Sequence, residues 1–263
     1  MFTTLPQLAQ ASARPTARAT ALGGRARRPA LALAALALAG LGTLAHAAPS
    51  GPKVWDFQVR LDDKPIGYHR FTVQTEGNQR QVSNTARFAV KVLGLTVYRY
   101  AIDTEERWQG DCLTSMRSRT DDDGELIDMQ ATRTGTTYQL RNKAGTRSVD
   151  GCLTGYAYWL PEVLARQTRL LNPQSGEIDA VSLSPNGMGT IEVGGQKVSA
   201  RKLRLAAPPG AFDVWVSEQG DWLGLDAKVR GGRQLSYRLA TLPAWWPEGS
   251  TQAKPTADTG ARP

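Results

Sequence analysis

Apolar and polar residues alternate along most of the chain after residue 50. The alternation recurs in residues 54–61, 68–75, 82–92 and 95–108. The first of these segments places Trp55, Phe57, Val59 and Leu61 on one face. A period of two is typical of a β-strand with one buried face, because successive side chains point to opposite sides of a sheet. The pattern predicts a meander of roughly six or seven strands up to about residue 140.

Turn-forming residues divide the alternating segments. The stretches DDKPIG at 62–67 and DDDG at 121–124 combine Asp, Pro and Gly, which favour tight turns. Glycine pairs stand at 194–195 and 231–232, again between alternating segments. Two successive glycines can both adopt positive φ, as a two-residue hairpin turn requires. We therefore expect hairpins at both pairs, continuing the antiparallel pattern.

One segment departs from the period of two. Residues 160–171 carry an apolar stripe, with Pro161 fitting the first helical position and Glu162 suiting the positive N-terminal end of a helix. Asn172 and Pro173 follow as a stop signal. The sequence predicts one helix of about ten residues inserted in the middle of the chain.

The number of expected strands constrains the architecture. An open sheet of about ten or more strands rarely stays flat. We expect an all-β, mainly antiparallel fold, a long meander curled into a barrel, a half-barrel or a β-roll. The helix near 160–171 would cover an opening or an edge. The alternative architecture is a two-sheet sandwich.

The first 47 residues have a different composition. Arg25, Arg27 and Arg28 precede an Ala/Leu-rich run at 30–44, and small residues flank position 46. This order is typical of a secretory signal peptide; an uncleaved membrane anchor is the alternative for the apolar run. We predict a leader and signal peptide over 1–47, a single exported domain over 48–243 and a disordered tail over 244–263. The expected location is the bacterial periplasm.

Removal of the leader changes the charge balance. The formal charge of +8 includes five basic residues and no acid within 1–47, which leaves 27 basic and 24 acidic residues, a charge of +3. A net charge this small is not typical of nucleic-acid-binding domains, which are strongly basic. We expect no nucleic-acid binding, and contact with a membrane only through the signal peptide.

The chain has two cysteines, Cys112 and Cys152. Two cysteines of an exported protein meet an oxidising compartment, where they usually form a disulfide. Two separate thiols and a redox pair are the alternatives, although no Cys-x-x-Cys is present. A zinc site needs about four ligands, and His69 is the one histidine after residue 47. We expect a disulfide, no metal site and no cofactor.

Two ionisable residues share strand faces with apolar ones. His69 is in phase with Phe71, so it is either a hydrogen-bonded core residue or a functional imidazole. Glu106 is in phase with Trp108 and needs a partner, for which Arg99, Arg107 or an arginine of a neighbouring strand is suitable. The two could also meet as a general base and the group that orients it.

Aromatic residues gather near both cysteine segments. The group comprises Tyr98, Tyr100, Trp108, Tyr156, Tyr158 and Trp159. It either packs as an aromatic core beside the disulfide or lines a cavity for an apolar ligand. The candidate ligand-pocket residues are therefore His69, Tyr98, Tyr100, Glu106, Trp108, Tyr158 and Trp159. In DDDGEL at 121–126, a solvated hairpin turn is favoured over a calcium site, because the full EF-hand loop spacing is missing.

Several stretches together resemble a known family. They are LDDKPIGYHRFTV, YRYAIDTEERWQGDCL, RTDDDGELIDM, GCLTGYAYWLPEVLARQTRLLNPQSGE and the closing GGRQLSYRL. Over roughly residues 54–239 the chain resembles domain-of-unknown-function family 6134, a set of exported bacterial proteins. The resemblance implies an exported, mostly β protein. It implies no activity and supplies no catalytic residues.

Three classes of function are compatible with the sequence. The favoured one is a periplasmic, non-catalytic binding protein for an apolar small molecule or lipid, which predicts a large apolar cavity. The second is a structural or accessory envelope protein, which predicts a filled interior and an exposed apolar patch or free strand edge. The third is a hydrolase-like enzyme using His69, which predicts that histidine in a cleft beside a partner.

Overall fold

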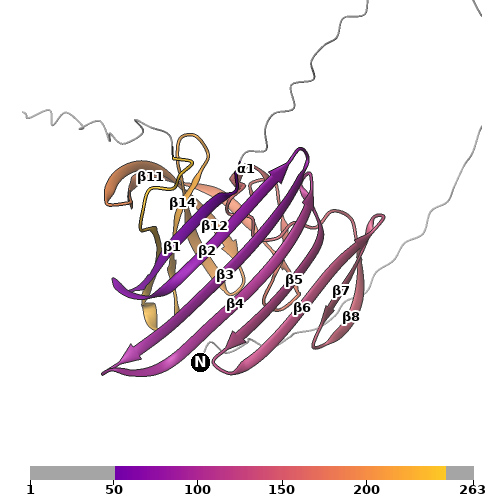
Figure 1. Cartoon of the computed structure of the whole chain (residues 1–263), viewed down its shortest axis with the longest axis horizontal. Coiled ribbons are helices and arrows are strands. Elements are labelled where there is room, and N and C mark those ends of the chain that lie inside the picture. The colour runs from indigo at the N-terminus through magenta and orange to yellow at the C-terminus, as the bar shows by residue number, and fades with distance from the viewer. Residues whose placement is uncertain (1–50, 247–263) are drawn as a thin grey trace, which may run out of the picture. The chain divides into compact units, whose positions relative to one another are not determined.

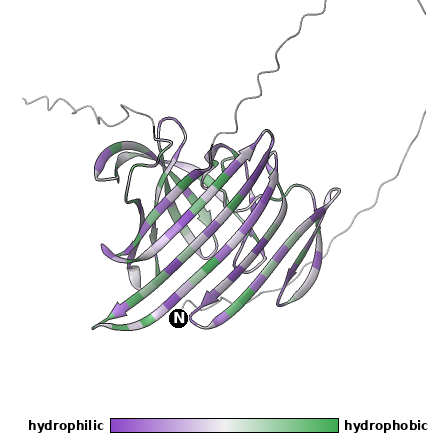
Figure 2. Ribbon diagram, viewed as in Figure 1, coloured by the Kyte–Doolittle hydropathy of each residue, from purple (hydrophilic) through white to green (hydrophobic). Residues whose placement is uncertain are grey.

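In the computed structural model, which describes residues 51–246, the alternation of the sequence becomes an alternation of burial. Along β1 (Lys53–Leu61), the four apolar side chains from Trp55 to Leu61 are buried and the residues between them are partly exposed. Figure 2 shows the same alternation of hydrophobic and hydrophilic residues along the neighbouring long strands. The predicted leader (1–47) and the tail beyond Trp246 lie outside the described residues.

The remaining strands follow in chain order. The next seven are β2 (Lys64–Glu76), β3 (Gln79–Val92), β4 (Leu95–Gln109), β5 (Cys112–Asp122), β6 (Glu125–Thr134), β7 (Thr137–Asn142) and β8 (Gly145–Asp150). After helix α1 (Pro161–Leu164) come β9 (Arg169–Leu171), β10 (Ile178–Ala180), β11 (Ser182–Val193), β12 (Gln196–Ala207), β13 (Gly210–Val216) and β14 (Trp222–Lys228). A short 3₁₀ turn, η1 (Arg230–Gly232), precedes β15 (Gln234–Leu239).

Thirteen strands of the described region form one antiparallel sheet. Their order is β11-β12-β13-β14-β15-β1-β2-β3-β4-β5-β6-β7-β8. Strand β15 pairs with β1 in the register Phe57↔Leu239, so the last strand joins the two meanders into one sheet. The prediction of an all-β antiparallel fold is confirmed. Strands β8 and β11 are the two edges of this sheet.

The sheet is curled but does not close into a barrel. Strands β2 and β14 are separated by two others in the sheet, yet the rings of Phe71 and Trp222 lie 5.0 Å apart between their centroids. At the other side, the turn after β11 bends toward β15, where the Gly194 N–H donates to the Leu239 carbonyl at 2.8 Å. Figure 1 shows the resulting open, curved sheet. Cumulative strand twist explains why so many strands curl.

The predicted helix over 160–171 is wrong in its extent. Helix α1 has four residues, and Pro161 does occupy its first turn. Leu170 and Leu171, read from sequence as part of a helical stripe, belong to β9 and pair with β10. The Asn172 carboxamide oxygen accepts hydrogen bonds from the Gln174 and Ser175 N–H groups. Asn-Pro therefore starts a hairpin turn instead of ending a helix.

The segment between β8 and β11 covers the inner face of the sheet. Leu113 N–H of β5 donates to the Leu153 carbonyl at 2.9 Å. The rings of Trp108 and Trp159 meet edge to face at 5.5 Å, and Tyr158 lies 5.1 Å from Trp222. We call residues 151–181 the covering segment. It contacts both halves of the curled sheet and fills the space between them with aromatic rings.

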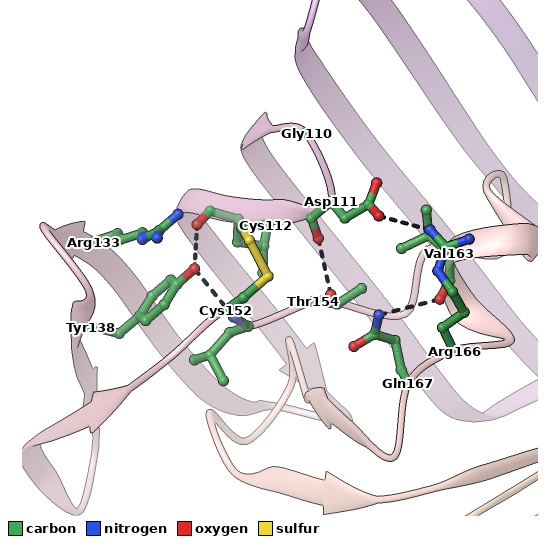
Figure 3. The surroundings of a disulfide bond; sticks show 12 residues. Gly110, Asp111, Cys112, Arg133, Tyr138, Cys152, Thr154, Val163, Arg166 and Gln167 are labelled. Carbon is green, nitrogen blue, oxygen red and sulfur yellow. Dashed lines mark hydrogen bonds and ion pairs between the residues drawn. A yellow bond between two sulfur atoms is a disulfide. The ribbon is translucent and has the colours of Figure 1, made fainter.

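The predicted disulfide is present. Cys112 and Cys152 are joined with a Cα–Cα distance of 5.2 Å, which ties the start of β5 to the start of the covering segment (Figure 3). Beside it, the Tyr138 hydroxyl donates to the Leu113 carbonyl at 2.5 Å and accepts from the Leu153 N–H at 3.2 Å. The disulfide and these bonds anchor the segment at one point.

The packed region extends past the predicted domain end at residue 243. Trp245 lies 5.0 Å from Trp55, and its indole N–H donates to the Val54 carbonyl at 2.8 Å. Trp246 also packs against the core. The two tryptophans therefore belong to the folded domain.

Removing the disulfide tests the anchoring of the covering segment. The 40-residue separation predicts that the Cys112→Ala/Cys152→Ala variant loses about 4 kcal/mol of unfolding free energy, because the open chain gains conformational entropy. Urea denaturation of the oxidised protein and the variant measures this difference. An unchanged midpoint and slope would contradict the anchoring role.

Gly67 in β2 tests the close approach of β2 and β3. Its φ is +155°, and a Cβ there would lie 1.9 Å from the Arg87 carbonyl oxygen. We expect Gly67→Ala to lower the unfolding free energy by about 3 kcal/mol or more, because backbone atoms must move. Gly210→Ala, where a Cβ meets nothing within 4 Å, is the matched control. Equal thermal unfolding of the two variants would refute this account.

Candidate functional site

The register of the sheet places His69 on the inner face, as its strand parity predicts. It pairs with Phe57 of β1 and Ala86 of β3. Its ring lies 4.4 Å from that of Phe71 and 5.5 Å from that of Tyr237. The Nε2 atom is 2.5 Å from the Asn84 carboxamide oxygen. The imidazole is thus held between aromatic rings by one polar partner.

The environment of His69 favours its neutral form. Burial lowers its pKa to about 4, and the hydrogen bond to Asn84 opposes this only in part. With Nε2–H donating to Asn84, Nδ1 keeps a lone pair that finds no partner within residues 51–246. This geometry matches a hydrogen-bonded core histidine.

Glu106 is buried on the inner face of β4. Its Oε2 accepts from the Trp108 indole N–H at 2.8 Å. Burial raises the pKa of this carboxyl from 4.5 to about 7, although the Trp108 hydrogen bond favours the ionised form. Within the described residues Trp108 takes the place of the arginine expected from sequence. His69 is bound to Asn84, so Glu106 does not orient it.

The predicted aromatic residues do not gather in one place. Trp108 and Trp159 pack together near the disulfide, and the Arg80 guanidinium lies 5.9 Å from the Trp159 ring. Tyr158 contacts Phe212 and Trp222 at the opposite half of the sheet. The disulfide does bring the two cysteine segments together, and the rings there pack as core.

Aromatic contacts link His69 directly to Tyr237 and, through Phe88, to Tyr100. The Tyr98 hydroxyl donates to Asp122 at 2.7 Å, and the Tyr100 hydroxyl accepts from the Gln174 side chain at 2.6 Å. Tyr237, which sequence reasoning missed, lies between His69, Phe57 and Phe88. Tyr237 lies on β15, and only the pairing of β15 with β1 brings it close to His69. Burial raises the pKa of its phenol, so this group is neutral at ordinary pH.

The opposite face of β1 carries a hollow of about 410 Å³. Its lining residues are Gln58, Arg60, Asp63, Glu192, Ser236, Arg238, Leu239 and Ala240. Most of these are polar or charged, and Arg238 is already paired with Asp226 at 2.7 Å. The candidate ligand-pocket residues predicted from sequence lie elsewhere. The hollow therefore lacks the aromatic lining expected for an apolar ligand.

The hairpin between β3 and β4 projects beyond its neighbours. The last residue of β3 paired with β2 is Phe88, and the first residue of β4 paired with β5 is Tyr100. At the base, the Asp123 N–H donates to the Arg99 carbonyl at 2.9 Å. Residues 90–97, which we call the hairpin tip, extend past these contacts (Figure 1).

The hairpin tip is apolar and exposed. The exposed fractions of its large apolar residues are 51% for Val92, 98% for Leu93, 72% for Leu95 and 54% for Val97. Leu93 has φ +50°, a conformation that branched side chains disfavour. The signal in the sequence that could have identified the tip is the apolar run VLGLTV at 92–97.

Other features of residues 51–246 bear on possible chemistry. There, no three His, Cys, Asp or Glu side chains gather as metal ligands do. In the DDDG turn, Asp121 accepts a hydrogen bond from the Gly124 N–H at 2.8 Å. In the same part of the chain, no helix has the length and apolar character that a membrane crossing demands.

An open, curled antiparallel sheet with its inner face covered defines a β-barrel-like protein. Within this class, the chain belongs to the family described as domain of unknown function DUF6134, whose model matches residues 57–240. The resemblance seen in the sequence is confirmed.

A solved structure shares the fold. It is the crystal structure of a beta-barrel-like protein of domain of unknown function DUF1849 from Brucella abortus. The TM-score is 0.53 at 10% sequence identity, over 74% of this chain and 98% of that one. At this identity the likeness shows the fold alone. Among curated proteins, no sequence matches the chain.

Glu106 makes the stability of the fold depend on pH. Its carboxyl ionises near 4.5 in the unfolded chain and near 7 in the folded one, so native stability falls as pH rises between these values. We expect Glu106→Gln, which keeps an acceptor for Trp108, to gain about 2 to 3 kcal/mol relative to wild type between pH 5 and pH 8.

Urea denaturation of both proteins at pH 5 and pH 8 measures the Glu106 effect. Because burial depresses the pKa of His69, the stability from that residue is lost as pH falls from 6.5 toward about 4. This opposite contribution is common to both proteins and cancels in the comparison. A wild-type to variant difference that stays constant across the pH range would show that Glu106 is not the titrating group.

Proposed function

We propose that this protein is a non-catalytic accessory protein of the bacterial envelope, exported to the periplasm, that binds an apolar or lipid-like partner through its surface. The hairpin tip carries this proposal. It exposes four large apolar side chains outside the packed body. Exposed apolar patches of this kind mark interaction sites in soluble proteins.

The packing of the interior supports a surface site over an enclosed one. Phe57 and Trp222 lie 4.3 Å apart between ring centroids, and Tyr158 adds a further ring at 5.1 Å from Trp222. These rings occupy the space between the covering segment and the sheet. A carrier of an enclosed apolar ligand needs that space empty.

The environment of the ionisable residues supports a non-catalytic role. A general base needs hydrogen-bond access to a substrate proton. Glu106 is instead buried and His69 is partly buried, and the polar partner of each belongs to the sheet itself. Their pKa shifts follow from burial, as in many structural residues.

Two features support export. The basic and apolar parts of residues 1–47 have the order of a signal peptide. The Cys112–Cys152 disulfide suits an oxidising compartment such as the periplasm.

Site-specific photo-cross-linking in living bacteria tests the proposed surface. A photoreactive residue at position 93 should form adducts, because 98% of that side chain is exposed. The same residue at position 136, an exposed turn at the opposite end of the meander, is the matched control. Absence of adducts at 93, or equal adducts at both positions, would overturn the proposal.

A further inference from the structure

The size of the hairpin tip limits what it can bind. It offers four large apolar side chains on one two-stranded projection. A stable protein interface uses about 20 residues or more on each side. Insertion at a lipid surface, by contrast, is driven by buried apolar area and by attraction of cations to anionic lipids, and it needs no matching protein surface.

The edges of the tip are poorly suited to strand addition. The pairing of β3 and β4 shifts register between Val90 and Lys91, which leaves Val97 as an extra residue. A bulge and a lysine on an exposed edge are features that block pairing with another strand. The tip is therefore a weak template for a second copy of this chain or for an extended peptide.

Two cations accompany the apolar side chains. Lys91 and Arg99 are both exposed, and neither side chain forms an ion pair within residues 51–246. Strand parity places them on the same outer face, since Ala89 pairs with Arg99 and lies two residues before Lys91. Asp122 and Asp123 lie at the base of the hairpin, where Asp122 accepts a hydrogen bond from the Tyr98 hydroxyl and Asp123 accepts one from the Arg99 backbone N–H.

The residue at the turn, Leu93, also favours a nonpolar partner. Asn or Gly adopts positive φ more readily than Leu. Leu93 gains nothing from packing, because 98% of it is exposed. An apolar side chain at the outermost position suits contact with a nonpolar phase. Tyr98, half-buried and bonded to Asp122, stands where tip meets body, a place typical of aromatic residues at lipid interfaces.

From these observations we infer that the hairpin tip inserts into the surface of a bilayer that contains anionic lipids. The inference rests on the proposed function and names its partner. Leu93 and Leu95 enter the boundary between headgroups and acyl chains, and Lys91 and Arg99 contact the anionic headgroups. This gives the folded domain a membrane contact of its own, separate from the predicted signal peptide.

Vesicle flotation tests the inference. The protein is purified as exported from bacteria expressing the full chain, and mixed with vesicles of phosphatidylethanolamine and phosphatidylglycerol. We expect wild-type protein to float with them and Leu93→Asn/Leu95→Thr to bind at least about tenfold more weakly. Met188→Gln, at a residue 56% exposed on β11, is the matched control and should bind as wild type.

Charge reversal separates the electrostatic contribution to vesicle binding from the apolar one. Lys91→Glu/Arg99→Glu should weaken binding to phosphatidylglycerol vesicles and leave the weaker binding to phosphatidylcholine vesicles unchanged. The same reversal at Arg169 and Lys197, exposed on other strands, should have no effect on either. Thermal unfolding of every variant confirms folding; Asn at position 93 suits the turn and should not destabilise it.

The outcomes are distinct. Wild-type protein that stays with the soluble fraction, or tip variants that bind like wild type, would overturn the inference. If vesicles fail while position 93 still cross-links to a protein in cells, surface binding stands and its partner is not lipid. Failure of both experiments would overturn the proposed function as well.

Discussion

Burial of one face of a long antiparallel sheet is the constraint on which the rest of the structure depends. Trp55, Phe57 and Phe71 line that face and must be removed from water. The sheet curls toward them, and the covering segment closes over them with Trp159 and its neighbouring aromatic residues. The disulfide anchors the segment at β5, so its covering position does not depend on packing alone.

The local sequence pattern correctly predicted the features that depend on neighbouring residues alone. The strands follow from alternation, and the disulfide follows from two cysteines in an exported chain. The predicted helix was too long because Leu170 and Leu171 fit a helical stripe as well as a buried strand. Their pairing partners in β10 lie seven residues or more along the chain, beyond the reach of the local pattern. The β15–β1 pairing joins residues about 180 apart, which no local signal specifies.

The same division applies to the candidate site. Strand parity correctly predicted that His69 faces inward. Its partner Asn84 lies on another strand, so their contact depends on the register of β2 and β3. The hairpin tip was missed for a related reason. Alternation shows which residues share a face and does not show where neighbouring strands end. Val92 and Leu95 continue the inner-face pattern of β3 and β4, but the sheet beside them has stopped.

The interior and the tip are two results of one pattern. Within the body, burial disfavours charge at the inner face: His69 is held neutral and ionisation of Glu106 is opposed. An interior arranged in this way is suited to the packing of aromatic and apolar side chains. The apolar face that is covered over most of the body becomes exposed at residues 90–97, where the hairpin extends beyond both neighbouring strands. The length of two strands thus leaves part of a folding pattern exposed as an apolar surface.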